Sequence, residues 1–414
     1  MGTETIYLGV DIGTSGVRAI IVDDTDVCVA EAGARFSRDP GDPAVWQATL
    51  AEVLVDLSQR ADFKAVRAVA VDGTSGTLLA VDARGQVLAK PIMYNEAVSD
   101  PETLAALEEL GQGDASRSAA GRAFHFNLAF PQARILHQAD WVASLFSGRF
   151  DVSDHNNALK TGFDPEGCRW TGLAASEALG LRLPSEVVAP GTAVGLAGAP
   201  LAQDLGFSPS TLVVAGTTDG CASFLASGAT QEGDGVTALG STLTLKLLSA
   251  SRIEDPASGV YSHRLLDCWL TGGASNTGGR VLAQHFESSE IARLSEGQAA
   301  RPATGLDYYP LPEPGERFPV NDASLAPVLT PRPQEDAVFL KAILEGIAKI
   351  EAAGYARLAA LGGPSLARVF TVGGGAGNAL WADIRREKLG LEPLAPLSTE
   401  AAFGAARLAR MGAQ

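Results

Sequence analysis

Short apolar runs alternate along the chain with longer stretches whose apolar positions follow a helical spacing. The runs 6–10, 17–22, 66–71 and 211–216 are rich in valine, isoleucine, leucine and alanine and end at turn residues, which predicts buried strands. Between such runs lie three predicted helices, at 46–58, 102–110 and 131–146. Strands interleaved with helices indicate an α/β fold.

The C-terminal half continues this alternation. Apolar positions three and four residues apart predict one long helix with a buried stripe at Phe339, Ile343, Ile347, Ile350, Gly354 and Leu358. A strand at 368–372, a glycine-rich turn at 373–377 and a helix at 378–389 are predicted after it. Seven prolines between 307 and 334 argue against regular structure there, so we expect an ordered surface excursion.

Two strand–turn–strand units of the same kind occur far apart. The first joins 6–10 to 17–22 through a Gly/Thr/Ser turn, and the second joins 235–240 to 243–248 through Ser241 and Thr242. Each half of the chain is therefore expected to carry one phosphate-facing hairpin, a hint of internal duplication. The predicted domains are 1–225 and 226–414.

Composition supports two domains and narrows the class of partner. The chain has 414 residues, against about 150 for a typical domain, and its 46% hydrophobic content can fill more than one core. Its 32 Lys and Arg residues stand against 48 Asp and Glu residues, a net charge of −16. We therefore expect neither a nucleic acid nor a membrane partner.

The cysteines and the N-terminal residues bear on the compartment. The four cysteines are widely spread without a C-x-x-C pair, so neither a zinc site nor a disulfide framework is predicted. The first residues lack a signal-peptide pattern, and no run reaches the roughly 20 apolar residues of a membrane helix. The expected location is cytoplasmic.

A carboxylate and small residues follow the first predicted strand, in the order Asp11, Ile12, Gly13, Thr14, Ser15 and Gly16. The exposed N–H groups and hydroxyls of such a turn suit the terminal phosphates of a nucleotide, with Mg²⁺ near the carboxylate. An ordinary tight hairpin turn accounts for the same residues equally well.

A second carboxylate, Asp219, lies in the motif GTTDG (216–220), where strand 211–216 leads into a predicted helix at 221–229. The carboxyl end of a strand beside a helix N-terminus is where α/β folds collect substrates. Asp219 could accept the proton of a sugar hydroxyl that attacks a γ-phosphoryl group. A helix N-cap is the alternative role for this residue.

A third motif, VGGGAGN (372–378), joins a strand to a helix through glycines. Missing side chains let a base or ribose approach the backbone, and Asn378 could contact the nucleotide or cap the helix. A bare helix-entry turn is equally compatible. The motif lacks the third glycine of a dinucleotide fingerprint, which makes a dehydrogenase a minority interpretation.

Six motifs together occur in the order found in the FGGY carbohydrate kinases, which the chain resembles over essentially its whole length. They are DIGTSGVRA (11–19), VDGTSGT (71–77), GTTDG (216–220), ALGSTLTLK (238–246), GGASNTGG (272–279) and VGGGAGN (372–378). Within that family the chain looks similar to the short bacterial and plastid-type members described as D-ribulose kinases and also as xylulose kinase-like. It shares the character of YSHRL (261–265), GLDYYPLP (305–312) and GERFP (315–319) with them.

The resemblance implies a duplicated ribonuclease H-like fold of the actin-like ATPase type, with a sugar-binding N-terminal domain, a nucleotide-binding C-terminal domain and a central cleft. It also implies that Asp219 is the catalytic base and that Asp11 helps position Mg²⁺ and phosphates, so both carboxylates are candidate metal ligands. The implied ATP-binding residues are Gly13, Thr14, Ser15, Gly240, Ser241 and Thr242 along the phosphates and Gly278, Gly279, Gly374, Gly375 and Asn378 around the adenosine.

The loop after strand 66–71 is the implied sugar loop. Longer xylulokinases resemble Gln-Met-His-Gly there, whereas this chain has Gly73-Thr74-Ser75-Gly76, so Ser75 replaces a histidine contact and argues against ordinary xylulokinase specificity. Residues 93–96 resemble a second sugar-facing loop, and 154–160 either border the pocket or form Asx turns. The predicted sugar-binding residues are Asp11, Ser75, Asn95, Glu96 and Asp219.

The sequence thus predicts Mg²⁺- and ATP-dependent phosphorylation of a ketopentose, D-ribulose to D-ribulose 5-phosphate, by in-line transfer in a monomer or homodimer. A D-xylulose or pentitol kinase, a non-catalytic sugar sensor and a sugar-independent actin-like ATPase remain as alternatives. The presence of both Asp11 and Asp219 favours an enzyme, because a sensor needs no base.

Overall fold

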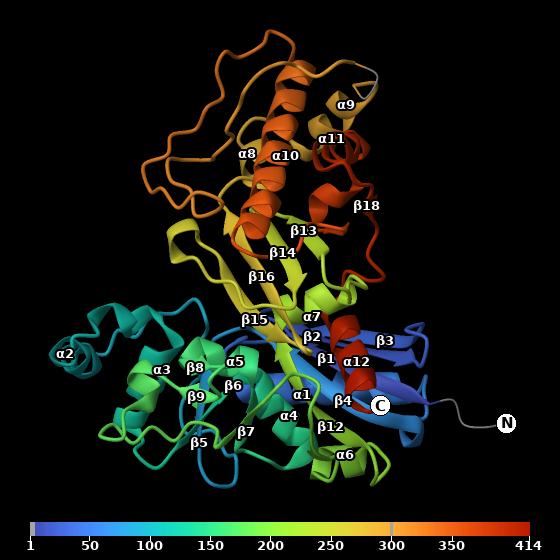
Figure 1. Cartoon of the computed structure of the whole chain (residues 1–414). Coiled ribbons are helices and arrows are strands. Elements are labelled where there is room, and N and C mark those ends of the chain that lie inside the picture. Colours follow the sequence, from blue (N-terminus) through green and yellow to red (C-terminus); the bar gives the residue numbers. More distant parts are fainter. Residues whose placement is uncertain (1–4, 299–300) are drawn as a thin grey trace. The chain divides into compact units, whose positions relative to one another are not determined.

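The computed structural model describes residues 5–298 and 301–414, which divide into two compact units (Figure 1). The first unit comprises Met1–Ala226, Arg264–Leu266 and Glu400–Gln414, and the second comprises Ser227–His263 and Asp267–Thr399. Two segments that follow residue 225, 264–266 and 400–414, therefore lie in the first unit, so a single boundary in the sequence does not describe the division.

The first unit is built on a six-stranded sheet in the order β11-β12-β4-β1-β2-β3. Its first three strands form an antiparallel meander, β4 and β12 run parallel to β1, and β11 is antiparallel to β12. The strands are β1 (Ile6–Ile12), β2 (Gly16–Asp23), β3 (Cys28–Arg35), β4 (Val66–Gly73), β11 (Ala193–Leu196) and β12 (Leu212–Thr218).

Helices cover both faces of this sheet because successive side chains of a strand point to opposite faces. On one face, α1 (Pro43–Ser58) and α4 (Gln138–Ser147) cover Leu8, Val10 and Val71. On the other face, α12 (Ala401–Gly412) packs beside α7 (Asp219–Ala226) over Tyr7, Ala68 and Ala70 (Figure 1).

Glycines allow α12 to pack closely against β1 and α7. A Cβ at Gly9 on β1 would overlap the Ala402 carbonyl oxygen, and a Cβ at Gly404 would overlap the Ala222 carbonyl oxygen of α7. Only glycine permits backbone contact of this kind at both surfaces of the helix. The C-terminal helix is thereby held on the strand that carries Asp11.

The remaining elements of the first unit are short. The prediction of one helix over 131–146 was wrong at its start, because 134–137 forms strand β6 antiparallel to β5 and the helix begins only at Gln138. Backbone pairing with the distant β5 makes this segment a strand. The elements are β5 (Leu78–Val81), α2 (Pro101–Glu109), α3 (Ala119–Ala129), β6 (Arg134–His137), β7 (Val152–Asp154), α5 (His155–Thr161), β8 (Phe163–Asp164), β9 (Arg169–Trp170), β10 (Glu186–Val188) and α6 (Pro200–Asp204).

The second unit has its own six-stranded sheet, in the order β15-β16-β14-β13-β17-β18. Strand β14 is antiparallel to both β13 and β16, whereas β17 runs parallel to β13 and β18 parallel to β17. The strands are β13 (Asp234–Leu239), β14 (Leu243–Ser249), β15 (Tyr261–Leu265), β16 (Cys268–Ser275), β17 (Arg368–Val372) and β18 (Pro393–Leu394).

The helices of the second unit include α10, whose predicted apolar stripe is buried as expected. The helix packs on β14 and β16, and Phe339, Ile343 and Ile347 lie in the core of this unit. The proline-rich segment 307–334 contains isolated bridges but no helix or strand, as predicted. The helices are α8 (Gly279–Ala283), α9 (Ser288–Ser295), α10 (Asp336–Ala360) and α11 (Ala379–Leu389).

The two sheets repeat one arrangement of strands. In the first unit the order β3-β2-β1-β4-β12 combines three antiparallel strands with two parallel ones, and in the second unit β16-β14-β13-β17-β18 does the same. The internal duplication hinted at by the two hairpins is therefore confirmed. No helix within the described residues is both long and apolar enough to span a membrane.

Candidate active site

Three parallel strands bring the predicted carboxylates of the first unit to one edge of its sheet. Asp11 on β1 lies opposite Asp72 on β4, and Thr217 on β12 lies opposite Asp72 on its other side. Asp219 follows Thr218, which pairs with Gly73. Because the carboxyl ends of parallel strands meet at the same edge, Asp11, the loop after Gly73 and Asp219 are neighbours.

Asp72 is a site carboxyl that the sequence prediction missed. Its side chain is fully buried, and its oxygens accept no hydrogen bond from the described residues. Burial raises the pKa of Asp72 well above its usual value, and the nearby Asp11 carboxylate raises it further. Burial therefore favours the protonated form of Asp72, which is able to donate a hydrogen bond to Asp11.

Asp11 remains the more accessible member of this pair. Burial is the main cause of a raised pKa at Asp11; the neighbouring Asp72 side chain opposes this shift, the Asp219 carboxylate adds to it and the Arg18 guanidinium opposes it. Asp219 is the first residue of α7 and is half-buried, and its Oδ1 accepts the Gly220 N–H at 2.8 Å. Asp219 therefore stands near the positive end of a helix, where a carboxylate is stabilised.

The turn between β1 and β2 is closed by its own hydrogen bond, from the Gly13 N–H to the Gly16 carbonyl oxygen at 3.0 Å. Thr14 and Ser15 are exposed at its tip. The geometry is that of a tight hairpin turn, and it leaves the hydroxyls accessible, so the two interpretations of this motif are compatible.

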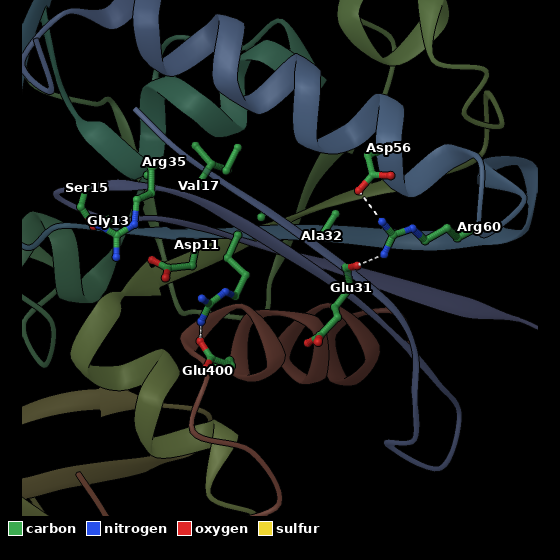
Figure 2. A pocket seen from close by; sticks show the side chains of 14 residues that line it. Asp11, Gly13, Ser15, Val17, Glu31, Ala32, Arg35, Asp56, Arg60 and Glu400 are labelled. Carbon is green, nitrogen blue, oxygen red and sulfur yellow. Dashed lines mark hydrogen bonds and ion pairs between the residues drawn. The ribbon is translucent and has the colours of Figure 1, made fainter. Parts of the chain in front are cut away.

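A groove of about 750 Å³ runs from this turn along β2 and β3 (Figure 2). Figure 2 shows the Asp11 carboxylate and the Arg35 guanidinium at one end, next to Gly13 and Ser15. Arg18 in the groove pairs with Glu400, whereas the Arg35 side chain forms no ion pair with any residue that the structure describes. The sequence prediction named neither arginine, because their common groove depends on strand pairing.

The predicted sugar loops lie on either side of a bridge between Leu78 and Ile92. Ser75 is partly buried and Asn95 is exposed, and neither side chain makes a hydrogen bond within residues 5–298 and 301–414. Glu96 is different, because its Oε2 accepts the Met93 N–H at 2.9 Å and so caps its own loop.

The segment 154–160 forms the start of α5. The Asp154 carboxylate caps this helix by accepting the N–H groups of Asn156 and Asn157 at 2.8 and 3.2 Å. The Asn156 side chain also donates to the Thr217 hydroxyl at 2.9 Å, two residues before Asp219. The segment therefore has an Asx-type cap and lies beside the strand that leads to Asp219.

The second unit gathers its predicted glycines at the ends of β13, β16 and β17. The Gly279 N–H donates to the Gly240 carbonyl oxygen at 2.8 Å, and the Arg280 N–H donates to the Ser241 carbonyl oxygen at 3.1 Å. A Cβ at Gly375 would lie 2.9 Å from the Leu239 side chain, next to Gly240. The structure thus brings 240–242, 278–279 and 373–375 together.

Asn378 caps α11. Its Oδ1 accepts the Trp381 N–H at 3.0 Å, and its Nδ2 donates to the Ser295 hydroxyl at 3.0 Å. Both ends of the side-chain amide are therefore engaged within the second unit, and a nucleotide contact from Asn378 stays a prediction.

Comparison with known proteins agrees with these features. The model of the FGGY family of carbohydrate kinases, C-terminal domain, matches residues 242–413. A xylulose kinase from Streptomyces coelicolor is 28% identical over 280 residues, which span 62% of this chain and 56% of that protein. The match thus covers little more than half of that relative's length. A xylulose kinase from Bacillus subtilis is 24% identical over an alignment that spans 98% of this chain and 88% of that protein.

Solved structures share the fold. A protein from Brucella ovis described as xyloylose kinase superimposes with a TM-score of 0.83 at 24% identity, covering 99% of this chain and 90% of the other. The duplicated actin-like ATPase fold predicted from the motifs is therefore confirmed. Residues 242–413 therefore match the C-terminal domain of the FGGY family of carbohydrate kinases, and the whole chain shares the fold of the solved xyloylose kinase.

Proposed function

We propose that the chain is an ATP-dependent kinase that phosphorylates a ketopentose, with D-ribulose as preferred substrate and D-ribulose 5-phosphate as product. The edge formed by β1, β4 and β12 carries this proposal, because it sets Asp11, the Ser75 loop and Asp219 at adjacent strand ends. Relatives named xylulose kinase support the reaction class.

Asp219 is the proposed general base. As the sugar hydroxyl oxygen bonds to the γ-phosphorus of ATP, its proton passes to the Asp219 carboxylate, the bond to the β–γ bridging oxygen breaks and ADP leaves. No covalent enzyme intermediate is needed. The hydrogen bond from the Gly220 N–H restrains the orientation of this carboxylate.

Asp11 and Asp219 are the proposed protein ligands of Mg²⁺. Their carboxylate oxygens are hard ligands, and the orphaned carboxyl of Asp72 beside Asp11 marks a polar interior there. Within the described chain, no three His, Cys, Asp or Glu side chains are placed to enclose a metal ion. This fits an ion that takes its other ligands from phosphates and water. When bound, Mg²⁺ would neutralise charge on the transferred phosphoryl group.

The glycine loops of the second unit are the proposed nucleotide site. A Cβ at Gly374 would meet no atom within 4 Å, and the backbone there is not left-handed, so the chain itself does not require glycine at this position. A nucleotide lying against the loop would account for the missing side chain, because a base or ribose needs close approach to the backbone.

Ser75 and Asn95 are the proposed determinants of sugar choice. D-Ribulose and D-xylulose differ only in the configuration at C3, so one hydrogen bond can discriminate between them. A buried polar group left without a partner costs about 1–3 kcal/mol, which corresponds to roughly 5- to 150-fold in affinity. Ser75 occupies the position at which the longer xylulokinases resemble a histidine-containing loop. This difference supports a preference for D-ribulose over D-xylulose.

The test is ADP release from Mg·ATP with D-ribulose, D-xylulose, L-ribulose, ribitol or no sugar. The proposal expects fast turnover with D-ribulose, slower turnover with the other sugars and only weak hydrolysis without sugar. Equal ATPase activity in every sample would refute the kinase and favour an ATPase. Sugar binding without turnover would favour a sensor, and a preference for D-xylulose would overturn the substrate alone.

A further inference from the structure

Arg122 on α3 is a buried cation whose hydrogen-bond acceptors are all main-chain carbonyls. Its side chain belongs to a residue that is only 3% exposed, and among the described residues it forms no ion pair. The Nε donates to Glu96 at 2.9 Å and the Nη1 to Gly76 at 3.1 Å. The Nη2 donates at 2.7, 2.8 and 3.0 Å to the carbonyl oxygens of Tyr94, Glu96 and Arg117.

This arrangement is costly unless the carbonyls need the donors. Burying a charge without a counter-ion is unfavourable, and charge-assisted hydrogen bonds in fork geometry are the main compensation available to an arginine. Gly76 lies in the loop of Ser75 and has a φ of +90°, and Tyr94 and Glu96 flank Asn95. One guanidinium therefore bonds to both predicted sugar loops.

A second chain of hydrogen bonds joins the same two loops. The Tyr94 N–H donates to the Thr77 hydroxyl at 3.1 Å, and the Thr74 and Thr77 hydroxyls lie 2.7 Å apart. The Thr74 hydroxyl in turn donates to Gln138 Oε1 at 2.5 Å. Since the Thr74 proton goes to Gln138, the Thr77 hydroxyl is the donor to Thr74. The network anchors both loops on the start of α4.

We propose that Arg122 is a positioning residue that fixes the Ser75 loop relative to the Asn95 loop and thereby sets the fit of the site to a ketopentose. This inference rests on the proposed function. Two flexible loops would hold the same side chains over a range of separations. The guanidinium instead fixes Gly76, Tyr94 and Glu96 around one rigid plane, because its donors point in set directions.

The experiment compares wild type with Arg122→Ala, Arg122→Lys and a control, Arg182→Ala, in the full chain. Arg182 is exposed and donates only to Gln132 on the surface. For Arg122→Ala we expect KM for the ketopentose to rise about 10- to 100-fold, as misplacement of a binding group does, with KM for ATP unchanged. The discrimination between D-ribulose and D-xylulose should also shrink.

Two further variants of the measurement separate positioning from simple stability. Added guanidinium ion, below denaturing concentrations, should lower the sugar KM of Arg122→Ala and leave the control unaffected. Arg122→Lys keeps the charge without the planar fork and should recover part of the effect. The inference would be overturned if KM for ATP rose as much as KM for the sugar while the melting temperature fell. It would also be overturned by a wild-type sugar KM in both Arg122 variants.

Hydrogen exchange tests the inference without turnover. The amides of Leu78, Ile92 and Tyr94 bond across the two loops, so they should exchange faster in Arg122→Ala than in Arg182→Ala. If wild type phosphorylates no sugar, the proposed function fails, while faster exchange would still show that Arg122 fixes the loops. Unchanged exchange would overturn the inference whether or not the protein is a kinase.

Discussion

The two units use one strand order but end their strands in different chemistry. In the first unit the ends of β1, β4 and β12 carry carboxyl groups, at Asp11, Asp72 and the following Asp219. In the second unit the ends of β13, β16 and β17 lead into glycines and hydroxyls, at 240–242, 278–279 and 373–375. The two similar frames therefore differ at their strand ends, which is where the proposed base and the proposed nucleotide loops lie.

The interiors behind these edges differ in the same way. The first unit buries an unpaired polar group, the Asp72 carboxyl, close to its edge. The second unit buries a paired network, in which the Glu351 carboxylate receives Arg385 at 2.7 and 2.8 Å and the Thr237 hydroxyl at 2.6 Å. An unpaired group is suited to react or bind, whereas a satisfied network rigidifies the loops it supports.

The largest expected effect concerns Asp219. Replacement by Asn removes the proton acceptor but keeps the shape, so kcat should fall about 10²- to 10⁴-fold, the usual contribution of a general base. Because the proposed glycine loops for the nucleotide lie in the other unit, the affinity for ADP without Mg²⁺ should stay nearly intact. Turnover and ADP titration are the measurements, with exposed Asp204→Asn as control. A wild-type kcat in Asp219→Asn would show that Asp219 is not the general base.

The buried ion pair of the second unit comes next. Glu351→Gln leaves Arg385 buried without its counter-ion, and both side chains are at most 1% exposed. Loss of one partner of such a pair costs about 3–5 kcal/mol. We expect this loss in the free energy of unfolding of the second unit, followed by hydrogen exchange in β13 and β17. Glu335→Gln, which breaks the exposed pair with Arg301, should cost less than about 1 kcal/mol, and equal costs would contradict the distinction.

A buried histidine of the first unit gives a pH prediction. Burial, with smaller contributions from Lys160 and Arg122, lowers the pKa of His137 to about 3. The unfolded chain therefore binds more protons than the folded one below about pH 6.5, so stability falls as the pH falls through that window. From pH 6.5 to pH 5, wild type should lose about 2 kcal/mol more than His137→Gln.

Comparison with the variant isolates this histidine from other groups. The pKa of Asp154 is raised by burial to about 6, which stabilises the folded state as the pH falls below that value, but it does so in both proteins. Thermal melting of each protein across the pH range gives the difference. Parallel curves for wild type and His137→Gln would show that His137 is protonated in the folded state.

The smallest effect tests the glycine edge of the second unit. Gly374→Ala and Gly377→Ala each add a Cβ that meets no atom within 4 Å, so neither should change stability. Only Gly374 is a predicted nucleotide contact. We expect KM for ATP to rise about tenfold in Gly374→Ala, equivalent to about 1.4 kcal/mol, and to stay unchanged in Gly377→Ala. Equal ATP kinetics in both variants would place the nucleotide away from Gly374.

Much of this comparison was accessible from the residues. The apolar runs gave most strands of both sheets and the stripe of α10, because hydrophobic periodicity is local. The motifs around Asp11 and Asp219 and the glycines at 373–377 were identified for the same reason. The start of the helix at 131–146 was wrong, since only the distant β5 makes 134–137 a strand.

The missed residues share one property, which is dependence on distant segments. From the sequence, Asp72 is an ordinary strand residue. Only the pairing of β4 with β1 and β12 places it between Asp11 and Thr217. From the sequence, nothing distinguishes Arg122 from the other arginines of the chain. The folded structure brings the Gly76 and Tyr94 carbonyl oxygens to it as acceptors. The position of α12 on the first unit could not be predicted either, because residues 267–399 of the second unit precede it in the sequence.

By itself the sequence determined the α/β class, the duplicated hairpins and the order of motifs that resembles the FGGY family, because these depend on spacing and on residue type. Only the tertiary structure decided which carboxyl is fully buried beside Asp11 and which arginine joins the loops of Ser75 and Asn95. It also decided that the C-terminal helix returns to the first sheet. Burial and hydrogen-bond partners are set by residues tens or hundreds of positions away, and no local pattern encodes those contacts.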